Sequence, residues 1–258
     1  MFKSFSHSNW TRFDQENVTM IWHHEPINAK TTKPSHRHND ICSFVLYING
    51  QPILVDTGRP TYNLNDPFGN YGVSAKSHNS VIIDDFEPQV GVRTQRFPVF
   101  YSKTNLKIKI TEKDNYHRIE FIHDGFSRLR TDKIIFSRSF EIYENYIIIK
   151  DSFKGSKEHI TSTFLHWYPN LIININKSDS TLVEFRNLDS SVAGTLKCSG
   201  YNNISHNPDF LLYQGETKDG IAGWYSNEYG KKIECFTLQI KEKMFFPATR
   251  QYRIEWKA

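Results

Sequence analysis

Short runs of apolar residues with a period of two recur along the chain and predict β-strands. In residues 106–110, apolar side chains alternate with Lys107 and Lys109, which predicts an apolar face and a solvated lysine face. Residues 134–142 keep the same period, and residues 146–149 follow the turn Glu144-Asn145. These two segments predict a β-hairpin, with residues 161–168 as the candidate next partner.

Further apolar runs arrive at short intervals, separated by turn dipeptides such as Asn49-Gly50 and Tyr229-Gly230. They cover residues 41–48, 52–56, 79–84, 117–122, 171–175, 181–185, 221–225, 233–240 and 252–256. This cadence predicts an all-β fold, a large antiparallel two-sheet β-sandwich of the supersandwich kind, with almost no helix. The whole chain, residues 1–258, forms one domain in this interpretation, with the site in residues 16–90 and the remaining strands in residues 91–258. The longest segment without strand character, residues 58–76, predicts a functional loop.

Composition narrows the class of protein. Aromatic residues make up 14% of the 258 residues, which suits half-buried sheet surface. A net charge of +4 is too small for the concentrated positive field of a nucleic-acid binder. The sequence shows neither an apolar run of roughly 20 residues nor the apolar centre of a signal peptide, so we expect no membrane insertion and no export signal in this chain.

Histidine and aspartate side chains concentrate in the first third of the chain. In an extended segment His36, His38 and Asp40 share one face, because residues two apart project the same way. Asp56 ends the next apolar run, which a hairpin at Asn49-Gly50 would fold back beside the first. His78 precedes another apolar run and supplies one more imidazole.

Two imidazoles and a carboxylate suit a divalent metal, and zinc fits this nitrogen and oxygen mixture best. We predict that His38, Asp56 and His78 are the ligands. His36 then faces solvent or substrate, and Asp40 orients one of the histidines by accepting a hydrogen bond. Asn79 either holds the loop through Asx-type hydrogen bonds or reaches the substrate.

These residues carry a family resemblance. His36-x-His38-x-Asp40, Gly50-x-Pro52-x-Leu54-x-Asp56-x-Gly58, Tyr62 and Ser77-His78-Asn79 resemble, in order and spacing, the heparinase II/III-like C-terminal domain of bacterial polysaccharide lyases. The resemblance implies an antiparallel sandwich, metal ligands at His38, Asp56 and His78, and a sugar-facing His36. It also implies β-elimination on a uronate-containing polysaccharide such as heparan sulfate, a related glycosaminoglycan or alginate, and a location in the periplasm or cell envelope.

The chain departs from the complete lyases in one respect. In the family, an α-helical toroid precedes the sandwich and usually supplies the catalytic tyrosine and an Asn or His that neutralises the substrate carboxylate. The sequence shows no such helical region, so we expect full activity to need a separate toroid chain or domain. Tyr62 or Tyr71 is a candidate phenol for the proton transfers, and we assign Tyr62; a sugar-stacking or structural role is the alternative.

Two other functional classes compete with this interpretation. A non-catalytic carbohydrate-binding or scaffolding module would keep the metal as a structural element, with Trp22, Trp167 and Trp224 as sugar platforms unless they lie in the core. A metallo-β-lactamase-like hydrolase shares the opening His-x-His-x-Asp, but Ile41 stands where that family has a further histidine. The pair His23-His24 is expected at the surface, and the alternative is that it extends the site from a neighbouring strand.

Overall fold

The computed structural model describes residues 1–25, 38–89, 91–93, 98–100, 104–129, 132–189, 191–201 and 208–257, with the backbone alone for residues 91–93, 98–100 and 201. His36 lies outside the described residues, so its role stays a prediction.

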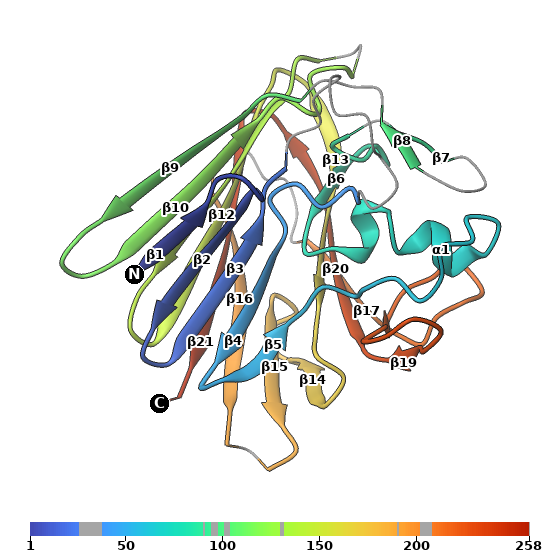
Figure 1. The fold of residues 1–258 in the computed structure, drawn as a ribbon. Helices are drawn as coiled ribbons and strands as arrows, with labels where there is room; N and C mark the ends of the chain where they lie inside the picture. Colours follow the sequence, from blue (N-terminus) through green and yellow to red (C-terminus); the bar gives the residue numbers. More distant parts are fainter. Residues whose placement is uncertain are drawn as a thin grey trace.

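Three antiparallel sheets make up most of the described fold (Figure 1). The five-stranded sheet contains β1 (Phe2–Phe5), β2 (Trp10–Gln15), β3 (Val18–His23), β4 (Phe44–Ile48) and β5 (Gln51–Leu54) in that order. The eight-stranded sheet contains, in spatial order, β14 (Leu171–Ile175), β15 (Leu182–Asn187), β16 (Ala193–Tyr201), β21 (Ala248–Trp256), β12 (Tyr146–Lys154), β11 (Ile135–Ile142), β10 (His117–His123) and β9 (Leu106–Glu112). The four-stranded sheet contains β17 (Asp209–Gln214), β20 (Phe236–Phe245), β13 (Glu158–His166) and β6 (Val81–Ile83). Two short ribbons pair β7 (Gly91–Arg93) with β8 (Pro98–Phe100) and β18 (Trp224–Tyr225) with β19 (Ile233–Glu234).

The five-stranded and four-stranded sheets join end to end where β5 meets β13. The Val55 N–H donates to the His166 C=O at 2.9 Å, and the Tyr168 N–H donates to the Ile53 C=O at 3.0 Å. Buried apolar side chains from this joined layer and from the eight-stranded sheet form one continuous core. The fold is therefore the antiparallel β-sandwich that the sequence predicts.

Local sequence explains the hairpins. Asn49 and Gly50 adopt φ values of 51° and 74° between β4 and β5, which is the left-handed pair that a tight hairpin turn requires. Along β12, partly exposed and buried residues alternate, so one face of the strand packs on the core. The predicted hairpin is confirmed, because β11 and β12 pair with Phe140 opposite Ile149.

Two details of the predicted strands are wrong. The next neighbour of β12 is the C-terminal strand β21, whereas β13 pairs with β20 and β6 in another layer. Ile108 and Ile110 in β9, an edge strand of the eight-stranded sheet, are 37% and 42% exposed, so the expected apolar face is not buried at these two positions. The lysines on the opposite face of β9 are exposed as expected.

Two short helices lie in the long loop between β5 and β6. Helix α1 (Pro67–Tyr71) begins after Asp66, whose Oδ1 accepts from the Phe68 N–H at 2.8 Å, and Pro67 occupies its first turn. The 3₁₀ helix η2 (Ala75–Ser77) begins after Ser74, whose hydroxyl accepts from the Lys76 N–H at 3.2 Å. In the part of the chain that is described, neither helix nor any other is long and apolar enough to cross a bilayer.

Candidate functional site

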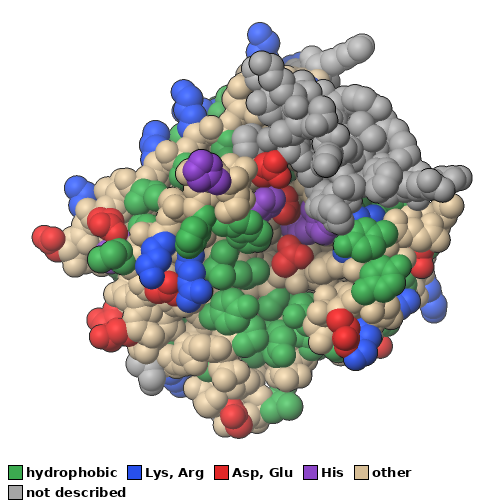
Figure 2. Space-filling model, viewed as in Figure 1, with side chains coloured by type: hydrophobic (Ala, Val, Ile, Leu, Met, Phe, Trp, Pro, Cys, Tyr) green, Lys and Arg blue, Asp and Glu red, His purple; other side chains and the backbone are tan. Residues whose placement is uncertain are grey.

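The predicted ligands come from three segments that the fold brings to one place. His38 precedes β4, Asp56 follows β5, and His78 lies between η2 and β6. The Thr57 hydroxyl donates to the Ser77 C=O at 2.9 Å and so ties the segment of Asp56 to that of His78. The face of the molecule shown in Figure 2 carries a group of histidine and acidic side chains near its centre.

Asp56 and His78 are in direct contact. Asp56 Oδ2 lies 2.6 Å from His78 Nδ1, and Asp56 Oδ1 accepts from the Gly58 N–H at 2.9 Å. The rings of His38 and His78 lie side by side, with centroids 5.2 Å apart and planes at 33°. The structure thus brings together the three residues that the sequence assigns as ligands.

Burial opposes the charged form of all three side chains, whereas the contact between Asp56 and His78 favours the charged form of those two. Burial, together with the neighbouring charge of His78, lowers the pKa of His38 to about 4. Burial opposes the ionisation of Asp56, yet the charge and hydrogen bond of His78 hold the pKa of Asp56 well below its ordinary value. Burial likewise opposes the charge of His78, but the charge and hydrogen bond of Asp56, together with the charges of Asp40 and Glu87, outweigh burial and raise the pKa of His78. His38 is therefore a neutral imidazole at neutral pH, and Asp56 is ionised.

Asp40 accepts a hydrogen bond, but from a histidine other than the predicted ligands. Its Oδ2 lies 2.8 Å from Nδ1 of His23, on β3. Burial is the largest effect and works against the charge of Asp40, but the hydrogen bond with His23 and the charges of His23, His78 and His38 together outweigh it and lower the pKa of Asp40. The charge of Asp40 also acts on His38 and His78. The surface role expected for the His23-His24 pair is wrong: His24 is buried, and His23 extends the site through Asp40.

Asn79 is buried and holds three backbone groups through its side chain. Its Nδ2 donates to the C=O of Phe44 at 2.7 Å and of Val55 at 3.1 Å, and its Oδ1 accepts from the His166 N–H at 2.8 Å. The Asn79 C=O accepts from Nη1 of Arg138 at 2.7 Å. Asn79 therefore fixes the backbone beside His78 to both layers of the sandwich.

Tyr62 lies in the loop between Asp56 and His78. Its ring is 48% exposed and stacks on Tyr229 with centroids 5.8 Å apart. The guanidinium carbon of Arg59 lies 4.7 Å from the centroid of the Tyr62 ring. The neighbourhood of Tyr62 thus combines an aromatic face with a positive charge.

His166 is not among the predicted site residues; the structure places it at the end of β13. Its Nδ1 lies 2.9 Å from the Thr237 hydroxyl, and its Nε2 is buried without a partner among the described residues. Burial, together with the charge of His78, lowers the pKa of His166 to about 3. His166 follows an apolar run with the period of a strand, and that pattern alone does not distinguish a core histidine from a functional one.

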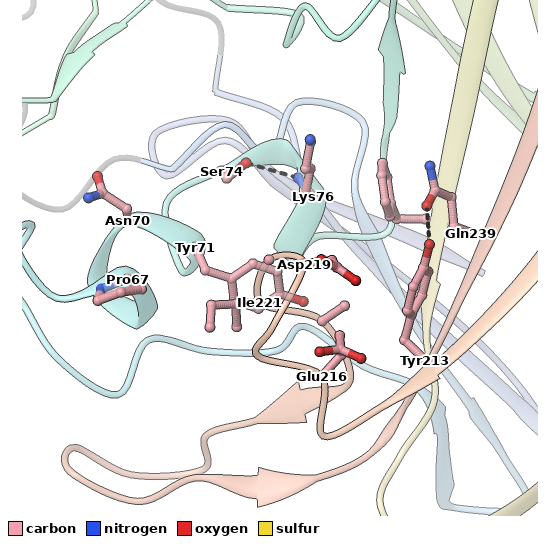
Figure 3. A pocket seen from close by; sticks show the side chains of 13 residues that line it. Pro67, Asn70, Tyr71, Ser74, Lys76, Tyr213, Glu216, Asp219, Ile221 and Gln239 are labelled. Carbon is pink, nitrogen blue, oxygen red and sulfur yellow. Dashed lines mark hydrogen bonds between the residues drawn. The ribbon is translucent and has the colours of Figure 1, made fainter.

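A cavity of about 470 Å³ opens beside the loop, between α1, η2 and the loop that follows β17 (Figure 3). Its lining mixes apolar side chains, such as Tyr71 and Ile221, with the charged side chains of Lys76, Glu216 and Asp219. The Tyr213 hydroxyl donates to Gln239 Oε1 at 3.1 Å on one wall (Figure 3). Tyr71 and Lys76 belong to the loop that leads to His78, so this loop forms part of the cavity wall.

The donor atoms suit a borderline divalent metal in their chemistry. Nε2 of His78 is buried and has no hydrogen-bond partner within the described ranges, and His38 is a neutral imidazole beside it. Asp56 Oδ2 lies at the other nitrogen of His78, Nδ1, so this carboxylate oxygen is hydrogen-bonded to the imidazole. Among the described residues, however, no three His, Cys, Asp or Glu side chains are arranged to hold an ion. The residues thus fit a metal by chemistry, while their arrangement does not form a closed ligand shell.

Comparison with known proteins identifies the fold. The profile described as heparinase II/III-like, C-terminal, matches residues 1–257. No curated protein sequence matches the chain. A heparinase III gene product of known structure has a TM-score of 0.74 at 16% identity, covering all of this chain and 36% of that one.

Two further solved structures show the same relationship. A mutant of the heparan sulfate lyase HepC from Pedobacter heparinus has a TM-score of 0.71 at 14% identity, covering all of this chain and 37% of that protein. Another heparinase III has a TM-score of 0.70 at 13% identity, covering 96% of this chain and 35% of that protein. The chain therefore spans about a third of the length of these structures, and at such identities the likeness concerns the fold.

Proposed function

The chain belongs to the family of heparinase II/III-like C-terminal domains, and from this premise we propose that it is the metal-bearing β-sandwich module of a polysaccharide lyase. Its substrate is a uronate-containing polysaccharide of the heparan sulfate or alginate type, cleaved by β-elimination. The observation that carries the proposal is the meeting of His38, Asp56 and His78 beside the junction of the five-stranded and four-stranded sheets. The periplasm or cell envelope is the proposed location.

β-Elimination needs proton transfer and charge neutralisation. A base removes the proton from the carbon next to the carboxylate, the bond to the glycosidic oxygen breaks as a double bond forms, and an acid protonates the departing oxygen. We assign His36 and Tyr62 to the sugar side of the site, where imidazole and phenol can take part in these steps. A helical toroid, as a separate chain or domain, supplies the remaining groups and the other wall of the cleft.

His38, His78 and Asp56 would hold a divalent metal, most simply zinc. When bound, the ion supplies positive charge and fixes the ligands. The neutral state of His38 leaves its imidazole available as a ligand at neutral pH. Asp40 and His23 add a second carboxylate and imidazole pair that orients the segment before β4.

Ultraviolet absorbance tests the lyase proposal, because elimination creates an unsaturated uronate. The chain is mixed with uronate polymer, alone and with a toroid domain from a heparinase III, and absorbance is followed. We expect new absorbance in the complemented mixture, lost in His78→Ala and kept in His117→Ala, a partly exposed histidine on β10. Absence of absorbance and of binding in both mixtures would contradict the proposal.

A non-catalytic binding module is the alternative function, in which the glycan would bind to exposed aromatic side chains without being cleaved. Of its predicted sugar platforms, Trp22 and Trp167 are fully buried and lie in the core, whereas Trp224 is partly exposed. Saturable binding of uronate polymer without any new absorbance, with or without the toroid, would favour this alternative.

A further inference from the structure

Arg59 carries a partly buried guanidinium whose hydrogen-bond donors are mostly unpaired. Nη2 donates to the Tyr62 C=O at 3.4 Å. Nε and Nη1 are buried and meet no acceptor within the part of the chain that is described. A guanidinium keeps its charge at any physiological pH, and buried charged donors without acceptors are unfavourable. The arrangement therefore favours an anion as the missing partner.

The surroundings of Arg59 are those of a sugar-binding surface. Tyr62 and Tyr229 stack on each other and are 48% and 67% exposed. Exposed aromatic faces pack against the apolar faces of sugar rings, while a guanidinium pairs with a carboxylate or sulfate through two parallel hydrogen bonds. The guanidinium of Arg59 lies over the ring of Tyr62, so the positive charge and the aromatic face are in contact.

The loop holds Arg59 in a fixed position. Gly58 has φ +70°, and a Cβ at this residue would collide with the C=O of Ser226, whose N–H donates to the Thr57 C=O at 2.7 Å. A Cβ on Gly72 would lie 2.8 Å from Cγ of Arg59, so the absence of a side chain at Gly72 makes room for the arginine stem. The guanidinium is therefore placed before any ligand arrives.

Arg59 also belongs to the neighbourhood of the histidine and aspartate cluster. It follows Asp56 by three residues, and its positive charge acts on His38. We propose that Arg59 binds an oxyanion of the glycan, a uronate carboxylate or a sulfate ester, and makes the site selective for charged sugar units. The glycan identity of the ligand rests on the proposed function, whereas the anion site rests on Arg59 itself.

Binding to matched oligosaccharides tests the selectivity. Calorimetry compares an unsulfated uronate oligosaccharide, its carboxyl-reduced form, and the reduced form after sulfation. We expect Arg59→Met to weaken the charged ligand by about ten- to a hundredfold and to leave the neutral one unchanged, with Arg59→Lys in between. The charged oligosaccharide whose affinity falls in Arg59→Met shows whether the bound oxyanion is a carboxylate or a sulfate. Arg12→Met is the control, because Arg12 is exposed and pairs with Asp14.

A small-anion titration separates failure of the anion site from failure of the lyase proposal. The Nε–H resonance of Arg59, assigned by its loss in Arg59→Lys, is followed while sodium sulfate or sodium glucuronate is added. A saturable shift without any polymer binding or cleavage would support the anion site and overturn the lyase proposal. The anion site alone would be overturned if the resonance did not shift and if wild type, Arg59→Lys and Arg59→Met bound the charged polymer with equal affinity. Melting curves check that the variants fold, and Arg59→Lys keeps the comparison valid if Arg59→Met does not.

Discussion

Arg138 and Asp151 form a bidentate ion pair in the interior of the sandwich. Nε and Nη2 of Arg138 lie 2.6 and 2.7 Å from the two carboxylate oxygens, and both side chains are almost fully buried. The residues stand directly opposite each other on β11 and β12. The remaining donor, Nη1, reaches across to the Asn79 C=O. The pair thus connects the eight-stranded sheet to the segment that carries His78.

Removing one partner of this pair is expected to destabilise the fold strongly. Asp151→Ala leaves a buried guanidinium without its anion and should lower the free energy of unfolding by about 3–5 kcal/mol. Replacing both residues, as Arg138→Met with Asp151→Leu, should recover much of this loss. Urea unfolding measures both. Asp14→Ala is the control, because its exposed pair with Arg12 should contribute less than about 1 kcal/mol. Equal costs for Asp151→Ala and Asp14→Ala would contradict the argument.

Asn79 is expected to act through the backbone and not on the substrate. Asn79→Ala removes three hydrogen bonds and leaves the buried Phe44 C=O and His166 N–H unpaired, which should cost about 2–4 kcal/mol in urea unfolding. The exposed Asn65, in the same loop region, provides the matched control as Asn65→Ala, expected within about 0.5 kcal/mol. An Asn79→Ala protein of unchanged stability that binds glycan more weakly would instead assign Asn79 to the substrate.

Metal content is the direct test of the ligand set. We expect roughly one zinc per purified chain, removed by a chelator with a fall in Tm and lost in His38→Ala and Asp56→Ala. Plasma mass spectrometry and thermal denaturation measure these effects, with His117→Ala as a histidine control on β10. A metal-free preparation whose Tm does not respond to added zinc would remove the metal from the proposed function.

The sequence predicts the architecture well because alternation and turn chemistry are local. The hairpins of β4 with β5 and of β11 with β12 follow from Asn49-Gly50 and Glu144-Asn145, which lie between apolar runs. The hairpin also predicts Asp56 beside the segment of His38, and the ligand assignment adds His78 to the same neighbourhood, where it contacts Asp56. The order of the strands in the sheets does not follow from the sequence. Neighbouring strands such as β12 and β21 are about a hundred residues apart, and periodicity carries no information on which strands pair.

The supporting contacts of the site lie beyond what the sequence indicates. His23 pairs with Asp40 only because β3 runs beside β4, and β3 was not among the predicted strands. Arg59 is an ordinary loop residue in sequence; its unpaired donors become visible only when the chain around Gly58 and Gly72 is in place. The remaining determinants are long-range packing and hydrogen bonds, which no local pattern encodes.

His123 provides a pH-dependent contribution to stability away from the site. The side chain is buried between Phe126 and Phe136, with ring centroids 5.7 and 5.2 Å away, and its Nδ1 accepts from the Gly125 N–H at 3.2 Å. Burial lowers the pKa of His123 to about 3 in the folded protein. In the unfolded chain a histidine has a pKa of about 6.5.

The sign of the effect follows from proton binding. Between these two pKa values the unfolded chain binds a proton at this position that the folded protein does not, so stability is complete above about pH 6.5 and falls as pH decreases toward about 3. The slope is about 1.4 kcal/mol per pH unit.

His123→Phe loses the Gly125 hydrogen bond at every pH, but phenylalanine does not titrate and so contributes no such slope at this position. The stability of wild type minus that of His123→Phe should therefore be flat above about pH 6.5 and fall by about 2 kcal/mol by about pH 5, measured by urea unfolding. Other buried histidines, such as His24 and His166, are common to both proteins and cancel in the difference. Parallel curves for the two proteins over this range would mean that His123 takes up its proton in the folded state as readily as in the unfolded chain.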